Sequence, residues 1–275
     1  MAGMLRSALK SDDGFGPLAF EMKTVAHLMK RGFNVEFHDI EEGGGFDYLA
    51  TNETVEIEIE CKFISGDLGR KIHLKEFHQL STVLLPEMSN ALDQSDGGCL
   101  VRILIPRRLE ANIQQHNEIC RLMTHALANH ESNKKYSEYG VSILDIPVQG
   151  NLSDLISQGD VSLDDFKKFL FNEHGIENRN VIINFRPKKG VIFVVVESTK
   201  KDPVLNAIHR QLKASARNQL SGDRPGILCC YLAEVTKEVL LGLWNHQDEG
   251  TGLQFMVSNL IARRPEIHSV VFTTP

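Results

Sequence analysis

The feature that most constrains the fold is the run VEIEIECK at positions 55–62, in which apolar and charged side chains alternate. The apolar members are Val55, Ile57, Ile59 and Cys61, and the charged members are Glu56, Glu58, Glu60 and Lys62. A period of two is the spacing of a β-strand, whose successive side chains point to opposite faces of a sheet. The run therefore predicts a strand with one apolar face. It also places Glu60 and Lys62 together on the other face, roughly 7 Å apart along the strand.

A second acidic residue, Asp47, lies one predicted hairpin before this strand. It follows three glycines at 43–45 and stands at the start of a short strand predicted over 46–50. An Asp on one strand, with Glu60 and Lys62 on the next, can place two carboxylates and an ammonium around one point. Because Mg²⁺ is held by a few carboxylate oxygens and keeps several waters, the pattern predicts a hydrolytic site for Mg²⁺ or Mn²⁺.

These residue types suit the hydrolysis of a phosphodiester, which needs an activated water and neutralisation of charge on the phosphoryl oxygens. Asp47 and Glu60 would bind the metal, and the carbonyl oxygen of Cys61 would add a ligand. Lys62, a compact cation, would orient the attacking water or stabilise the transition state. The alternative is a half-solvated strand whose charges face water.

The elements predicted around the run follow a definite order. Apolar residues at helical spacing predict a first helix that carries Glu21 and ends near Gly32. Alternating patterns then predict strands over 33–38, 46–50 and 55–63. A helix starting near residue 73 and an apolar strand over 99–105 follow, so this region is expected to be α/β.

This order, together with the acid-x-Lys spacing of Glu60 and Lys62, resembles the PD-(D/E)xK nuclease superfamily and its restriction-endonuclease-like fold. The resemblance covers roughly residues 14–106. It implies an αβββαβ core with a mixed central sheet, followed by a further α/β region. Carried over by motif, it implies that Asp47 and Glu60 are metal ligands, Lys62 is the catalytic lysine and Glu21 is the helical acid. The implied activity is that of a metal-dependent nuclease, with DNA as the leading substrate.

Two readings besides a nuclease stay open. Phe46 rather than Pro precedes Asp47, which departs from the family pattern, and the superfamily includes members without activity. The same fold could therefore be a non-catalytic module that binds nucleic acid or a protein partner. The second is a different α/β hydrolase or transferase with its site in the C-terminal half, although no GxSxG elbow, GxxxxGK[ST] loop or dinucleotide glycine pattern is found.

Two groups of basic residues are candidates for contact with a phosphate backbone. Arg70 and Lys71 end a turn-rich loop just beyond Lys62. Arg210, Lys213 and Arg217 share one face of a helix predicted over 203–220. An ordinary solvated loop and an ordinary solvated helix face are the alternatives. Many nucleases of this kind cut two strands as homodimers, but the sequence identifies no dimer surface.

Composition limits the class of protein. With 42% hydrophobic and 24% charged residues, the chain is typical of a globular protein that buries its own core. A net charge of −6 argues against an indiscriminate DNA coat, while local patches decide whether nucleic acid binds. Five cysteines without a CxxC pair favour reduced thiols and no structural zinc site. The longest apolar run, at 191–196, is too short to span a membrane, so a cytoplasmic location is expected.

The division into domains is predicted from the same patterns. The nuclease-like core is assigned to residues 1–150, and a C-terminal α/β region to 151–275. The stretch 147–159 is the best candidate for a linker between them. Whether the C-terminal region is a second lobe or extends the same sheet is left open by the sequence.

Overall fold

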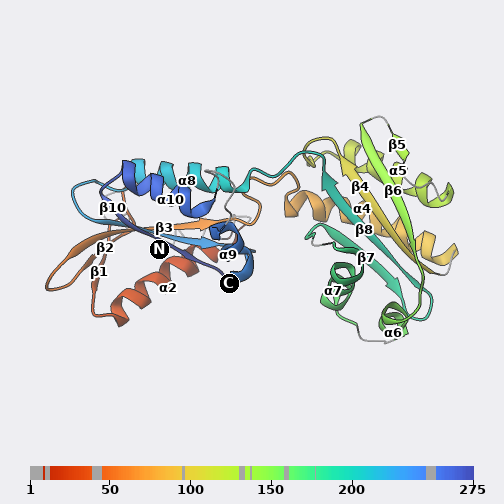
Figure 1. The fold of residues 1–275 in the computed structure, drawn as a ribbon, viewed down its shortest axis with the longest axis horizontal. Coiled ribbons are helices and arrows are strands. Elements are labelled where there is room, and N and C mark those ends of the chain that lie inside the picture. The colour runs from red at the N-terminus through yellow and green to blue at the C-terminus, as the bar shows by residue number, and fades with distance from the viewer. Residues whose placement is uncertain are drawn as a thin grey trace. The chain divides into compact units, whose positions relative to one another are not determined.

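The structure, a computed structural model, divides into two compact units (Figure 1). It describes residues 9, 13–38, 45–94, 97–129, 134–136, 138–157, 161–176, 178–245 and 252–275. The first unit, which we call the outer unit, comprises Met1–Gly69 and Pro203–Pro275. The second, which we call the inserted unit, comprises Arg70–Asp202 and so interrupts the outer unit once.

The outer unit is built on a mixed five-stranded sheet. Its strands lie in the order β1 (Asn34–Phe37), β2 (Tyr48–Thr51), β3 (Glu56–Ile64), β9 (Gly226–Leu232) and β10 (Ile267–Thr273). Neighbours from β1 to β3 are antiparallel, whereas β9 is parallel to β3 and β10 is parallel to β9. Parallel neighbours need a crossover connection. The crossover from β3 to β9 contains the inserted unit and α8 (Val204–Asn218), and the next contains α9 (Lys237–Asn245) and α10 (Leu253–Arg263).

Helices cover both faces of this sheet (Figure 1). On one face α2 (Gly16–Lys30) contributes Phe20 to a core with Ile59 and other odd-numbered β3 residues. On the other face α8 contributes Leu212 to a second core with α10 and the middle strands. The predicted alternation of β3 is confirmed, but the middle of its charged face is not solvated. Glu58 and Glu60 are 0% exposed, because β3 lies between β2 and β9 and both faces are covered.

The inserted unit has its own mixed five-stranded sheet. The strands lie in the order β5 (Lys134–Tyr136), β6 (Tyr139–Ile146), β4 (Gly97–Ile105), β8 (Gly190–Ser198) and β7 (Val181–Arg186). Only β4 and β8 are parallel neighbours among these described strands. One face is covered by α4 (Leu74–Gln94) and α5 (Ile113–Asn129), and the other by α6 (Asn151–Ser157) and α7 (Leu163–His174).

The structure corrects the predicted division of the chain. The expected boundary near residue 150 lies inside the inserted unit, and the helix and strand expected to complete the nuclease-like core, α4 and β4, belong to that unit as well. The strand that pairs in parallel with β3, on the edge opposite β2, is β9, far along the chain. Local periodicity predicts a strand but not its partner, because β4 and β9 are both apolar runs that follow a helix.

The predicted linker at 147–159 is also corrected, since it contains α6. This short helix buries Leu152 and Ile156 against the sheet of the inserted unit. Its neighbour α7 begins and ends as its sequence predicts, with Ser162 and Asp165 forming a capping box and Gly175 in the left-handed conformation. Among the described residues, no helix is long and apolar enough to cross a membrane.

Candidate functional site

Asp47 lies where the pairing of β2 with β3 ends. Its backbone N–H donates to the Ile59 carbonyl at 3.1 Å, and its Oδ2 accepts a hydrogen bond from the Cys61 N–H at 2.6 Å. The last ladder pair before it is Tyr48 with Ile59. The Asp47 carboxylate therefore replaces a backbone carbonyl in the ladder. This bond holds the Asp47 side chain against β3, at the residue that follows Glu60 in the chain.

Glu60 and Lys62 share one face of β3, as the alternation predicts. The Lys62 ammonium lies 2.5 Å from Oε1 of Glu60. The carboxylate is 0% exposed, whereas 23% of the Lys62 side chain is accessible. A buried carboxylate costs free energy unless a charge or hydrogen bonds compensate it. Lys62 supplies that compensation and also links the buried carboxylate to solvent.

The other buried carboxylate on this face, Glu58, was not singled out by the sequence. Its oxygens accept hydrogen bonds from the Ser221 backbone N–H, at 2.8 Å, and from the Ser221 hydroxyl. The Arg224 guanidinium lies 3.8 Å from Oε1. Glu58 therefore ties the loop before β9 to β3. In the sequence only Lys62, two residues after Glu60, distinguishes Glu60 from Glu58, because both occupy the same face of the same alternating run.

Glu21 lies on α2, so it approaches the sheet from the face opposite Glu60. Tyr48 is 1% exposed and packs in the core beneath α2. The pKa of Tyr48 is raised far above its usual value, first by burial and then by the negative charges of the carboxylates, Glu21 before Asp47 and Glu60. The three carboxylates therefore act on one buried phenol and share an electrostatic neighbourhood. Among the described residues, the Tyr48 hydroxyl meets no hydrogen-bond partner.

The thiol of Cys61 lies on the α2 face, opposite the Glu60 carboxylate. It hydrogen-bonds with the thiol of Cys229, its register partner on β9. That bond and burial raise the pKa of Cys61, while the same bond lowers the pKa of Cys229. All five cysteines of the chain are free thiols. The side chain of Cys61 is thus occupied away from the carboxylates, and only its carbonyl oxygen stays a candidate ligand.

Asp47 and Glu60 are the side-chain donors for the metal that the sequence predicts. The described residues contain no group of three or more His, Cys, Asp or Glu side chains that could hold a metal ion. Mg²⁺, however, is commonly held by one or two carboxylates and keeps several waters. Asp47 and Glu60 fit that requirement in number and chemistry. A site that needs three or four protein ligands, such as structural zinc, is not found in the described part of the chain.

The basic candidates divide between the two units. Arg210, Lys213 and Arg217 are exposed on α8, opposite the buried residues Ile208 and Leu212, so their predicted common face is confirmed. Arg70 and Lys71 are half-buried at the start of the inserted unit.

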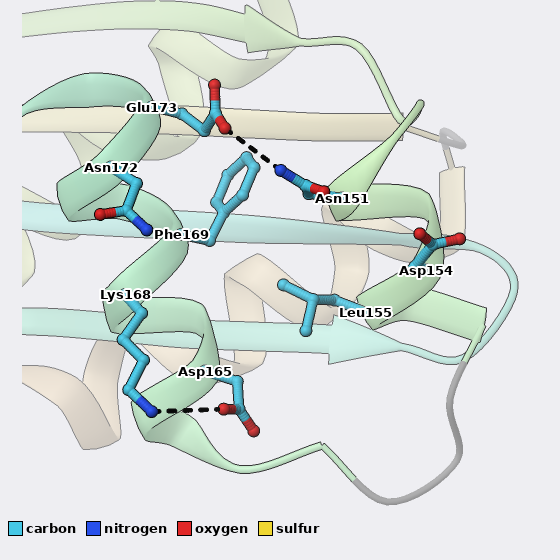
Figure 2. Close-up of a pocket in the computed structure, with 8 residues that line it drawn as sticks. All are labelled: Asn151, Asp154, Leu155, Asp165, Lys168, Phe169, Asn172 and Glu173. Carbon is cyan, nitrogen blue, oxygen red and sulfur yellow. Dashed lines mark hydrogen bonds and ion pairs between the residues drawn. The ribbon is translucent and has the colours of Figure 1, made fainter.

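Within the described part of the chain, two of the hollows belong to the inserted unit. One, of about 320 Å³, lies between α6 and α7 and is shown in Figure 2. Its polar side chains satisfy one another: Asn151 donates to Glu173 at 3.3 Å, and Lys168 lies 3.9 Å from Asp165. The other, of about 450 Å³, has Cys99 in its lining, and burial with the charge of Asp145 raises the pKa of that thiol to about 12. Neither hollow contains a predicted site residue.

Comparison with known protein families, with curated proteins and with solved structures gives no match to this chain. Function is therefore inferred from the geometry of the chain itself.

Proposed function

We propose that the outer unit is a metal-dependent nuclease of the PD-(D/E)xK type that hydrolyses phosphodiester bonds of DNA. The observation that carries the proposal is the Asp47 carboxylate, whose Oδ2 lies 2.6 Å from the backbone nitrogen of Cys61, the residue between the buried Glu60 and the Lys62 that contacts it. Asp47 thus lies beside the strand position that separates Glu60 from Lys62, at the end of the β2–β3 ladder.

The order of elements in the outer unit supports the proposal. With the inserted unit set aside, α2, β1, β2, β3, α8 and β9 follow the helix–strand–strand–strand–helix–strand order that the resemblance implies. The first three strands form an antiparallel meander, and β9 adds in parallel beside β3. Asp47 immediately precedes the second strand, and Glu60 and Lys62 lie on the third.

In this proposal Asp47 and Glu60 hold Mg²⁺, with the Cys61 carbonyl as a further ligand and Glu21 as an acid that assists from α2. The bound cation supplies charge neutralisation at the scissile phosphate and an acidified water. Lys62 orients the attacking water or stabilises the charge that develops on the phosphoryl oxygens. The Asp47 hydrogen bond to β3 fixes one carboxylate before the substrate arrives, so less ordering is needed during the reaction.

The test is cleavage of plasmid and linear DNA with Mg²⁺ or Mn²⁺ by wild type and by Lys62→Ala. The proposal expects cleavage to be lost while thermal stability and DNA binding are retained. Lys167→Ala is the matched control, because Lys167 belongs to another acid-x-Lys tripeptide, at 165–167, but is exposed on α7. Full activity of Lys62→Ala in a cleaving preparation would contradict the assignment.

The second candidate is the non-catalytic binding module. The net charge of −6 favours it. Calorimetric titration with Mn²⁺ and Mg²⁺, with and without DNA, separates it from the nuclease. Metal binding that disappears in an Asp47→Ala/Glu60→Ala variant supports the nuclease. DNA binding by a wild type that takes up no metal under either condition supports the module.

A further inference from the structure

One end of the inserted unit gathers basic residues from four separate segments. The segments are 70–76, 105–110, 178–180 and 198–202. They contain eight cations against three acids, Glu76, Glu110 and Asp202. The cations are Arg70, Lys71, Lys75, Arg107, Arg108, Arg179, Lys200 and Lys201. In a chain of net charge −6, this is a local reversal of sign.

The architecture brings these segments together. β4 and β8 are parallel, and their last residues, Ile105 and Ser198, are register partners. The segments at 105–110 and 198–202 therefore leave the same end of the sheet. β7 is antiparallel to β8, so its start, just after Arg179, lies at that end too. The first residues of the unit lead into α4 and lie at the same end, because the Lys71 carbonyl accepts the Leu109 N–H.

Hydrogen bonds join the four segments into one surface. Thr199 donates through its N–H to the Ile105 carbonyl at 2.9 Å and through its hydroxyl to the Pro106 carbonyl at 2.8 Å. Leu109 donates its N–H to the Lys71 carbonyl at 2.9 Å. Arg179 donates from its guanidinium to the Ile72 carbonyl at 3.0 Å. The chain segments that carry the cations are therefore held in fixed contact.

Three contacts position the basic residues themselves. The Asp202 carboxylate accepts the Lys71 N–H at 2.7 Å and lies 3.9 Å from the Arg70 guanidinium. The Arg108 guanidinium lies 3.0 Å from Nδ1 of His73. Asp202 thus contacts Arg70 and the backbone of Lys71, whereas the cations farther out are exposed to solvent.

The outer cations are Arg107, Arg108, Lys200 and Lys201, and all four are exposed. Within the described part of the chain, none of them forms an ion pair. α4 and α5 also begin at this end, because each runs back along the sheet from it, and helix N-termini favour anions. Exposed cations without acidic partners, next to two such termini, are suited to a polyanion rather than to a small neutral ligand.

We infer that this end of the inserted unit, which we call the basic end, binds the phosphate backbone of duplex DNA. The inference rests on the proposed function for its choice of ligand. It adds a binding surface in the inserted unit to the catalytic site proposed in the outer unit. Lys and Arg contacts of this kind give affinity that is independent of base sequence and falls steeply with salt.

The test compares the full-length wild type with Arg107→Gln/Arg108→Gln/Lys200→Gln/Lys201→Gln. Affinity for a fluorescent duplex of about 30 base pairs and random sequence is measured by anisotropy, in a chelator, over a salt series. The matched control is Arg102→Gln/Arg121→Gln/Lys167→Gln/Lys168→Gln. It removes four exposed cations from the same unit at positions outside the basic end.

The basic-end variant is expected to bind at least about tenfold more weakly near 0.1 M salt, and to lower the slope of log Kd against log salt by about 3. The control is expected to change both quantities much less. Equal losses in the two variants, unchanged binding by the basic-end variant, or no duplex binding by wild type each overturn the inference. So does a salt slope that changes for duplex RNA but not for duplex DNA.

Because binding is measured without divalent metal, the result does not depend on cleavage. A wild type that cleaves in a Lys62-dependent manner while the basic-end variant binds normally would overturn only the binding surface. A wild type that binds through the basic end but never cleaves would overturn only the nuclease proposal.

Discussion

The two sheets of this protein have the same number of strands but different interiors. In the inserted unit, β8 buries every residue from Gly190 to Val196, and all of them are apolar or glycine. In the outer unit, the equally long β3 is also covered on both faces, yet it buries Glu58 and Glu60 completely. An apolar run is what a doubly covered strand requires for folding. Carboxylates in such a place oppose folding unless they are compensated, so each needs a separate explanation.

The partners of the two buried carboxylates of β3 provide that explanation. Glu58 is bound by a backbone N–H and a hydroxyl of Ser221, in the loop before β9. Glu60 is bound by the partly accessible Lys62 and is the chain neighbour of Cys61, whose N–H holds Asp47. The first carboxylate holds a loop of the fold, and the second belongs to the group of charges that we propose a metal and a phosphate complete.

The strongest test of this comparison is to place a carboxylate in the sheet of the inserted unit. Val194 of β8 is 0% exposed in the core beneath α4 and α5. Val194→Asp is expected to lower the free energy of unfolding by more than about 4 kcal/mol, because no partner is positioned for the charge. Chemical denaturation followed by circular dichroism measures it, with Val194→Ala as the control for lost volume. A folded, only mildly destabilised Val194→Asp would show that this sheet tolerates charge as β3 does.

Removing the Glu60 charge should affect activity more than stability. Glu60→Gln is expected to lower DNA cleavage by about 10²–10³-fold, since the amide cannot bind metal as a carboxylate does. The unfolding free energy is expected to change by less than about 1 kcal/mol, because Lys62 can extend to solvent. Cleavage rates and denaturation midpoints are measured on the same preparation. A large stability loss with normal cleavage would make Glu60 a structural carboxylate like Glu58.

The reverse outcome is expected for Glu58. Glu58→Gln weakens the bonds to Ser221 and Arg224 and should lower the free energy of unfolding by about 1–3 kcal/mol. The cleavage rate per folded molecule should stay within about twofold of wild type. Such a change corresponds to a much smaller difference in activation free energy than a tenfold change in rate does. Denaturation and cleavage assays at a temperature where both proteins are folded test this pair of expectations. Loss of cleavage without loss of stability would move Glu58 into the site.

The smallest expected effect concerns pH and the inserted unit. The pKa of Cys99 is raised to about 12 by burial and by Asp145, so the folded state keeps the proton more tightly than the unfolded state. The stabilisation is complete below the unfolded thiol pKa and is lost as pH rises from there toward the folded value. Relative to Cys99→Ala, wild type should lose about 0.5–1 kcal/mol per pH unit between roughly pH 9 and 11. Parallel pH dependences of the two unfolding free energies would contradict the shift.

Much of the candidate site follows from local sequence. Alternation at 55–62 requires a strand, and a strand requires Glu60 and Lys62 to share a face, as their ion pair confirms. The short strand beginning after Asp47 and the turn between them place Asp47 beside β3, as its hydrogen bond to Cys61 shows. These features depend on residues within about one hairpin, where backbone geometry leaves few choices.

Other features depended on contacts between distant residues. The sequence identified the charged face of β3 but not that α8 and its neighbours cover it, nor that Ser221 compensates Glu58 and not Glu60. It identified Arg70 and Lys71 but not their association with residues 107–108 and 200–201, which only the parallel pairing of β4 and β8 creates.

By itself, then, the sequence determined most of the strands and helices and the residues that share a face, because these follow from side-chain periodicity along a few residues. Only the tertiary structure decided that β3 pairs with β9 rather than β4, that residues 70–202 form a separate unit, and which carboxylates are buried. The physical reason is that many apolar strands can pair with the same edge of a sheet. The choice among them is made by how all the helices and strands pack together, which no single segment specifies.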